Sequence, residues 1–315
     1  MRIIVPPIKS QGIKTKLVPW IQALVPKVSG QWIEPFLGTG VVAFNSGFRK
    51  ALLSEINPHI IRFYQSIKDH DITPSSVRRY LENEGLHLSK AAENGYAHFR
   101  VVKERFNAHK NPLDFLFLSR AGFNGMMRFN RNGEWNIPFC KKPNRFRRSY
   151  ITKIVNQVHD VACLIQPEWE FIVAPFEKII PLATKDDIIY CDPPYLGRYV
   201  DYYSGWNEGD EEKLFDFLST TPARFILSTW HHNDFRENQM ISKLWSKFNI
   251  VTRDHFYHSG GNIENRRAIV EALVFNFPAS IKKHNYGIEP KPEQLLLLKE
   301  RSTYIAKQLD REDVI

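Results

Sequence analysis

Short apolar runs, each about the length of a buried β-strand, recur along the sequence and are the feature that most constrains its fold class. Helix-like stretches such as residues 211–218 lie between the later runs. Strands that alternate with helices are typical of a largely parallel sheet with helices on both faces. The sequence therefore predicts an α/β fold, with strands at residues 31–34, 51–55, 170–174, 187–191, 224–229 and 269–275.

The long interval between the second and third apolar runs breaks this alternation. It begins with helical patterns such as residues 76–81 and then becomes rich in Gly, Asn and Arg. We expect residues 61–159 to form a mostly helical domain, inserted into a larger domain made of residues 1–60 and 160–278, which contains the predicted strands. The tail, residues 279–315, is expected to be a separate segment that can form an amphipathic helix.

The formal net charge of +9 favours a polyanionic partner, although many basic proteins bind no nucleic acid. Basic residues gather at positions 141–153, with Phe146 and Tyr150 between them. Such a mixture suits phosphates and exposed bases, and it also fits a solvated charged loop.

Neither a membrane protein nor a disulfide-stabilised one is indicated. No apolar run has the length that a bilayer requires, and the first residues are too short a run for a secretory signal, so we expect a cytoplasmic protein. Cys140, Cys163 and Cys191 form no CxxC pair, which argues against disulfides and against structural zinc. His231, His232, His255 and His258 lack carboxylates at ligand spacing, so no metal is expected.

A glycine loop, Glu34-Pro35-Phe36-Leu37-Gly38-Thr39-Gly40, follows the first expected strand and is expected to open a helix. Glycines at this point let the backbone approach a ligand closely. Glu55 ends the next strand, where a carboxylate typically accepts the hydroxyls of a ribose. Because a third glycine for a pyrophosphate is missing, the pattern favours a nucleoside cofactor without phosphates.

The segment Asp192-Pro193-Pro194-Tyr195 directly follows the strand expected at residues 187–191. The carboxylate of Asp192 and the carbonyl of Pro193 can accept hydrogen bonds from an exocyclic amine, which frees the lone pair of its nitrogen. The fixed φ of Pro193 and Pro194 aims that carbonyl in advance, and Tyr195 offers a ring on which a base can stack. Alternatively, the segment is a rigid turn.

Together these motifs resemble, in the same order, those of the Dam-like DNA adenine methyltransferases. The resemblance covers most of residues 1–278 and includes a cofactor motif at 7–14, the ribose segment at 54–57 and an insert signature at 119–139. It implies a Rossmann-like methyltransferase sheet, S-adenosylmethionine as cofactor, and an inserted target-recognition domain for duplex DNA. The implied cofactor-binding residues are Ser10, Lys14, Glu34, Pro35, Phe36, Gly38, Gly40, Glu55, Ile56, Phe176 and Asp192.

The chain departs from this family pattern near residues 174–176. Many relatives carry an acid there for the adenine ring of the cofactor, and none is apparent here, so Phe176 is expected to stack on the ring instead. After the catalytic motif, Trp206 and the tyrosines Tyr199, Tyr202 and Tyr203 either form a loop over the substrate base or pack at the start of a helix.

The polar residues of the insert are rich in hydrogen-bond donors suited to DNA. Taken apart from the resemblance, the same residues also fit a simple polar loop. The expected DNA-binding residues are Arg120, Asn124, Arg128, Asn130, Arg131, Asn132, Lys141, Lys142, Arg145, Arg147 and Arg148.

We therefore expect a site-specific methyltransferase that methylates adenine N6 after flipping the base out of duplex DNA. A cognate restriction endonuclease is a further possible partner. The alternatives are methylation of cytosine N4, methylation of adenine in RNA, and a non-catalytic DNA-binding regulator that retains the fold.

Overall fold

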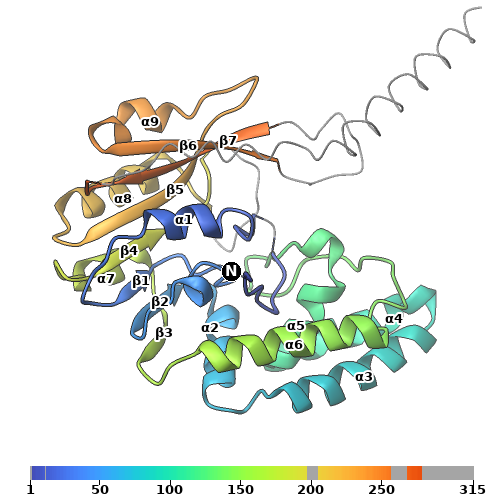
Figure 1. Cartoon of the computed structure of the whole chain (residues 1–315). Helices are drawn as coiled ribbons and strands as arrows, with labels where there is room; N and C mark the ends of the chain where they lie inside the picture. Colours follow the sequence, from blue (N-terminus) through green and yellow to red (C-terminus); the bar gives the residue numbers. More distant parts are fainter. Residues whose placement is uncertain (1, 11, 197–204, 257–267, 279–315) are drawn as a thin grey trace, which may run out of the picture. The chain divides into compact units, whose positions relative to one another are not determined.

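A seven-stranded sheet in the order β3-β2-β1-β4-β5-β7-β6 forms the centre of the protein (Figure 1). The computed structural model describes residues 2–10, 12–196, 205–256 and 268–278, and residues 1–279 form one compact unit. The tail that was expected at 279–315 lies outside the described residues. The strands are β1 (Trp32–Glu34), β2 (Ala51–Glu55), β3 (Trp169–Val173), β4 (Ile188–Cys191), β5 (Arg224–His232), β6 (Asn249–Phe256) and β7 (Ala268–Phe275).

Strands β1 to β5 are parallel, which confirms the predicted α/β sheet. Strand β7 differs, because it lies between β5 and β6 and runs antiparallel to both. Strand β6 was not predicted. It occupies the edge of the sheet, and its sequence mixes polar with apolar residues instead of forming a continuous apolar run.

Alternate residues of the central strands point to opposite faces of the sheet, as the two-residue period of a strand requires. Trp32 and Tyr190 join a core with α1 and the helices that follow β2, whereas Ile33 and Ile189 join a second core with α7, α8 and α9. Helices thus cover both faces, as predicted. The helices are α1 (Val18–Leu24), α2 (Pro58–Lys68), α3 (Pro74–Lys90), α4 (Tyr96–His109), α5 (Pro112–Ala121), α6 (Arg148–Leu164), α7 (Phe176–Ile179), α8 (Glu208–Thr220) and α9 (Gln239–Lys243).

Helices α2 to α6 fill the interval between β2 and β3. Three of them begin at a proline, Pro58, Pro74 and Pro112, a residue whose fixed φ and missing N–H suit the first helical position. Helix α3 packs on α6, and α5 packs on α2 and α4 (Figure 1). The apolar side chains of these helices belong to the same core as one face of the sheet, so the insert and the sheet share one hydrophobic interior.

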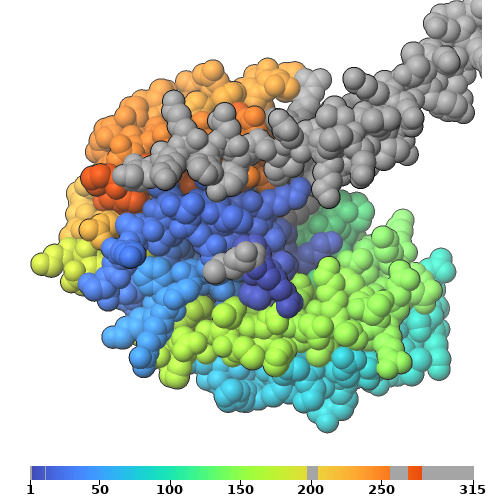
Figure 2. All heavy atoms as spheres, in the orientation of Figure 1, coloured from blue at the N-terminus to red at the C-terminus, as the bar shows by residue number. Residues whose placement is uncertain are grey.

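The N-terminal segment lies against the insert as well. Arg2 forms an ion pair with Asp160 of α6, with 2.9 Å between guanidinium and carboxylate, and Figure 2 shows this dark-blue segment beside the yellow-green helix. Among the described residues, no helix has the combination of length and apolar character that crossing a membrane requires.

Candidate active site

The glycine loop after β1 is shaped by two positive φ angles, +52° at Gly38 and +76° at Gly40. Such angles strain any residue with a Cβ, which explains glycine at both positions. A Cβ on Gly40 would also lie 2.5 Å from the ring of Phe44. The prediction that this loop opens a helix is wrong, because only a short 3-10 turn, Ala43–Asn45, follows it.

Glu55 holds this loop in place from the end of the neighbouring strand. Its Oε2 accepts a hydrogen bond of 2.9 Å from the Gly38 N–H, and its Oε1 accepts one of 3.2 Å from the Asn57 N–H. Burial raises the pKa of Glu55, whereas these backbone donors lower it in part. Each carboxylate oxygen has two lone pairs, so both can accept a further hydrogen bond from a ligand.

Asp192 directly follows β4, so it lies at the same edge of the sheet as Glu34 and Glu55, which end β1 and β2. The Nζ of Lys14 lies 3.0 Å from Asp192 Oδ1, and the Lys14 side chain is only 6% exposed. Burial raises the pKa of Asp192, the positive charge of Lys14 lowers it, and Glu271 raises it. Lys14 therefore favours the ionised form of the catalytic candidate.

Glu34 is a third acid of the pocket, and it is almost completely buried. The indole N–H of Trp32 donates a hydrogen bond of 2.8 Å to its Oε2. Burial raises the pKa of Glu34 well above its ordinary value, and the nearby charge of Asp192 raises it further. Glu34 thus carries an electrostatic cost that the fold tolerates at this position.

Tyr195 is fixed at both ends of its ring. Its hydroxyl donates a hydrogen bond of 2.6 Å to the buried carboxylate of Glu271 on β7, and Lys14 Nζ lies 4.5 Å from the ring centroid. Only 9% of Tyr195 is exposed. The tether to Glu271, which the sequence analysis missed, makes Tyr195 a rigid part of the site.

Three aromatic rings form one wall of the pocket. Phe36 stacks on Phe176 with centroids 5.5 Å apart, and Trp206 meets Phe36 edge-on at 5.6 Å. The indole N–H of Trp206 donates to Glu211, at the start of α8. Of the two roles considered for Trp206, it packs at this helix start and also lines the pocket, whereas Tyr199, Tyr202 and Tyr203 lie outside the described residues.

Two acids of this wall were missed by the sequence analysis. Glu177, directly after Phe176, and Asp210 of α8 both line the pocket. The Oε2 atom of Glu177 is buried and has no hydrogen-bond partner among the described residues. The acid that seemed to be absent near residues 174–176 is therefore present one position later, and its free oxygen suits a ligand that donates a hydrogen bond.

One pocket collects most of these features at the carboxyl ends of the strands, and the predicted catalytic residues Pro193 and Tyr195 are not among the residues that line it. Gly40 is the exception among the predicted cofactor-binding residues, because it shapes the loop without lining the cavity. The insert also contributes to the pocket through Met127, whose Sδ lies 3.5 Å from Asn57 Nδ2. The predicted residues that line the pocket are Ser10, Lys14, Glu34, Pro35, Phe36, Gly38, Glu55, Ile56, Phe176, Asp192 and Pro194.

Residues 10–259 match the family model described as D12 class N6 adenine-specific DNA methyltransferase. The chain belongs to this family.

Three relatives give the degree of similarity. The chain is 29% identical over 283 residues to the type II methyltransferase M.FokI of Planomicrobium okeanokoites, and the aligned region covers 86% of this chain and 42% of that protein. It is 31% identical over 195 residues to a DNA adenine methylase of Haemophilus influenzae, with 60% and 63% covered. It is 31% identical over 224 residues to a DNA adenine methylase of Vibrio cholerae, with 68% and 76% covered. The chain therefore spans less than two thirds of the length of the first two relatives.

Most of the basic and amide residues expected to bind DNA lie on the surface of this D12 class chain. Arg128 and Arg145 are half-buried, and the Asn130 side chain accepts hydrogen bonds from the N–H groups of Asn132 and Glu134, which shapes its own loop. The exposed members are Asn124, Asn130, Arg131, Asn132, Lys141, Lys142, Arg147 and Arg148.

Arg120 is a correction to the predicted DNA-binding set. It is 5% exposed, and its guanidinium donates hydrogen bonds to the Pro7 carbonyl and to Gln157 Oε1. Arg120 therefore joins the N-terminal segment to α6 inside the protein. Phe146 is a second correction, because it is buried and stacks on Phe117 instead of being available to a base.

The histidines considered for a metal lie apart. His231 and His232 are adjacent at the end of β5, with 2.9 Å between their Nδ1 atoms, and His255 is buried on β6. His258 lies outside the described residues.

Proposed function

We propose that this D12 class chain transfers a methyl group from S-adenosylmethionine to N6 of adenine at a specific site in duplex DNA. The observation that carries the proposal is that a single cavity is lined both by the loop held by Glu55 and by the Asp192 segment. A methyl donor and its acceptor amine must meet within one cavity for direct transfer, because in-line positioning supplies most of the rate.

The pocket residues fit the parts of this cofactor. Glu55 offers acceptors for the ribose hydroxyls, and Phe36 offers an aromatic face to the adenine. The unpartnered Glu177 Oε2 suits the exocyclic amine of that adenine, which can donate to it. When bound, S-adenosylmethionine supplies a positively charged methyl sulfonium, which the acids of the pocket favour.

Asp192 and the Pro193 carbonyl accept hydrogen bonds from the two N–H groups of the target amine, which directs the nitrogen lone pair toward the methyl group. The methylated nitrogen then loses one of these protons, for which the Asp192 carboxylate is an acceptor. Lys14 engages Oδ1 and favours the ionised form of Asp192, so we assign Oδ2 to the amine. Tyr195, fixed by Glu271, supports the extruded base through its ring. Residues 1–60 and 160–278 form the catalytic domain, and residues 61–159 act as the target-recognition domain.

Duplex DNA is the proposed macromolecular partner. The exposed basic residues of the insert would contact its phosphates, and a restriction endonuclease with the same target site is a second partner. One of the relatives, M.FokI, is named a type II methyltransferase, which supports the pairing.

The decisive experiment identifies the product. The purified chain is incubated with methyl-labelled S-adenosylmethionine and duplex DNA, and the DNA is digested to nucleosides for mass analysis. We expect the product to be N6-methyladenine. The proposal would be rejected by N4-methylcytosine as the product, by preferential labelling of a competing structured RNA, or by DNA binding without any label. Fluorescence of 2-aminopurine placed at the mapped target base would rise on binding if that base is extruded.

Two substitutions connect the product to the site. Asp192→Ala should abolish transfer while calorimetry still detects cofactor binding. Asp192→Asn, which keeps one acceptor oxygen but no charge, should lower transfer strongly and guards against loss of folding. Asp216→Ala, at an exposed acid of α8, is the matched control and should retain full transfer. Turnover like that of the unmodified chain in both Asp192 variants would contradict the assignment.

A further inference from the structure

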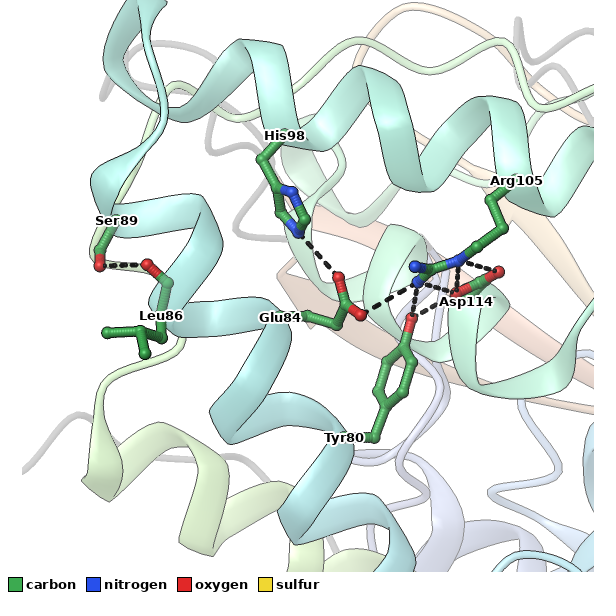
Figure 3. Close-up of polar contacts among 7 residues, drawn as sticks. All are labelled: Tyr80, Glu84, Leu86, Ser89, His98, Arg105 and Asp114. Carbon is green, nitrogen blue, oxygen red and sulfur yellow. Dashed lines mark hydrogen bonds and ion pairs between the residues drawn. The ribbon is translucent and has the colours of Figure 1, made fainter.

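Helices α3 and α4 bring together three potential metal ligands, none of which lines the pocket described above. Glu84 and His87 lie one helical turn apart on α3, and His98 comes from α4. His98 Nε2 lies 2.7 Å from Glu84 Oε2, and one ligand atom from each of the three residues falls within 4.8 Å of the other two. Figure 3 shows Glu84 and His98 pointing toward each other between the helices.

We propose that Glu84, His87 and His98 form a binding site for a transition-metal dication of the Zn²⁺ type. Two imidazoles and one carboxylate are a ligand set that Zn²⁺ accepts, with water completing the coordination. A spacing of three residues places Glu84 and His87 on the same face of α3. The sequence analysis did not consider this group, because its third member lies on another helix.

The geometry needs only a small adjustment. Zn–N and Zn–O bonds of about 2.0–2.1 Å at tetrahedral angles place ligand atoms about 3.3 Å apart. The His98–Glu84 pair must therefore widen slightly from 2.7 Å, and the most distant pair must close from at most 4.8 Å. His87 is exposed and gives the ion a path from solvent, and its long contact can close by rotation of its side chain.

The surrounding charges hold the carboxylate ready. Arg105 lies 3.2 Å from Glu84 Oε1 and pairs with Asp114, which also accepts from the Tyr80 hydroxyl (Figure 3). With neutral imidazoles, Glu84, Asp114 and Arg105 sum to one negative charge, which attracts a dication. Such outer contacts orient a ligand and increase metal affinity.

The ion takes the place of a shared proton. Without metal, His98 Nε2 shares a hydrogen with Glu84 Oε2. Coordination requires the Nε2 lone pair, so a neutral His98 binds as the tautomer with its hydrogen on Nδ1, and no proton leaves the protein. Glu84 Oε1 keeps its contact with Arg105 throughout.

The test titrates the full, metal-free chain with Zn²⁺ against a chromophoric chelator. We expect one ion per chain and a rise in the thermal unfolding midpoint, because a ligand of the folded state stabilises it. His87→Ala removes an exposed ligand with little risk to folding and should weaken binding at least about tenfold. The control, His109→Ala, removes an exposed histidine at the end of α4 and should bind as the unmodified chain does.

Cobalt identifies the ligands. Co²⁺ should give visible bands of a nitrogen- and oxygen-bound ion that disappear in His87→Ala and in His98→Ala. The proposal is overturned if the unmodified chain binds no Zn²⁺, if His87→Ala binds it equally tightly, or if Co²⁺ shows a thiolate charge-transfer band. Because these readouts involve neither DNA nor S-adenosylmethionine, they are independent of the proposed methyl transfer.

Discussion

Replacing Lys14 with Met tests whether this lysine keeps Asp192 ionised. At 3.0 Å and an effective dielectric constant of about 20, the attraction between the two charges is roughly 5 kcal/mol. Asp192 is 22% exposed at the pocket, so solvent screens part of this energy, and about half is a reasonable expectation. Met retains much of the apolar packing of Lys14 on the Tyr195 ring.

An energy of 2–3 kcal/mol corresponds to about two pH units, because one unit is worth about 1.4 kcal/mol. Asp192 is a stronger hydrogen-bond acceptor for the amine when it is ionised, so transfer declines as the pH falls through its pKa. Lys14→Met raises that pKa further, and the acid limb of the kcat/KM profile should move about two units toward higher pH. Radiolabel incorporation into duplex DNA, measured across the pH range, provides the profile.

Unfolding measurements check the same pair without reference to catalysis. Lys14→Met leaves Asp192 buried without its partner, whereas Lys14→Met combined with Asp192→Asn removes both charges. A double-mutant cycle should give a coupling of about 2–3 kcal/mol. Lys16→Met, at an exposed lysine two residues away, is the control. An acid limb that stays in place in Lys14→Met, together with a coupling near zero, would refute the reasoning.

Three further substitutions probe other parts of the molecule. Glu34→Gln should stabilise the unliganded protein while lowering its activity. Because the carboxyl pKa is raised in the folded state, the stability of the unmodified protein falls as the pH rises from the ordinary pKa through the raised one, so in urea unfolding the variant should gain most at pH 8 and nothing near pH 4. A larger loss of stability at pH 8 than near pH 4 would contradict this. Arg120→Ala should lower the unfolding midpoint by roughly 5–10 °C, because about 3 kcal/mol is lost when buried acceptors stay unpaired. Arg147→Ala, at an exposed arginine, should leave the midpoint unchanged. If both variants have the same midpoint, Arg120 is not an internal structural residue and returns to the set of DNA-binding candidates. Glu177→Ala should weaken calorimetric binding of S-adenosylmethionine about tenfold with a much smaller effect for Glu177→Gln, and unchanged binding in both would remove Glu177 from the adenine subsite.

The parallel part of the sheet was predictable because each of its strands contains a short apolar run, although the edge strand β3 is partly exposed. Strand β2 (Ala51–Glu55) was predicted to the residue and β3 within one residue, since continuous apolar runs mark such strands. The edge strand β6 and the antiparallel direction of β7 were not predictable in this way. An edge strand needs no apolar run, and the direction of a strand depends on contacts that the local sequence does not encode.

The site was predictable where motifs are contiguous and less so where chain segments meet. Glu55 ends β2 and Asp192 follows β4, the two strands that flank β1, so topology brings both residues to the same edge of the sheet. Glu271, Met127 and Asp210 reach the site or its support from a distant strand, the insert and a helix, and no spacing along the chain reveals this. Arg120 shows the reverse error, because an arginine in a polar, DNA-like sequence turned out to be an internal cation whose partners are distant in sequence.

The hydrophobic interior that runs without a break from one sheet face into helices α2 to α6 has a mechanical consequence. Two bodies that share tightly interlocked side chains cannot hinge against each other without opening voids, and such voids are costly. The insert is consequently a stiff extension of the sheet rather than a domain that closes by rotating toward it. If a double helix docks there, the bending and unstacking needed to deliver one base must be borne by the nucleic acid, and sites with easily deformed steps would then be favoured even at positions that no side chain touches.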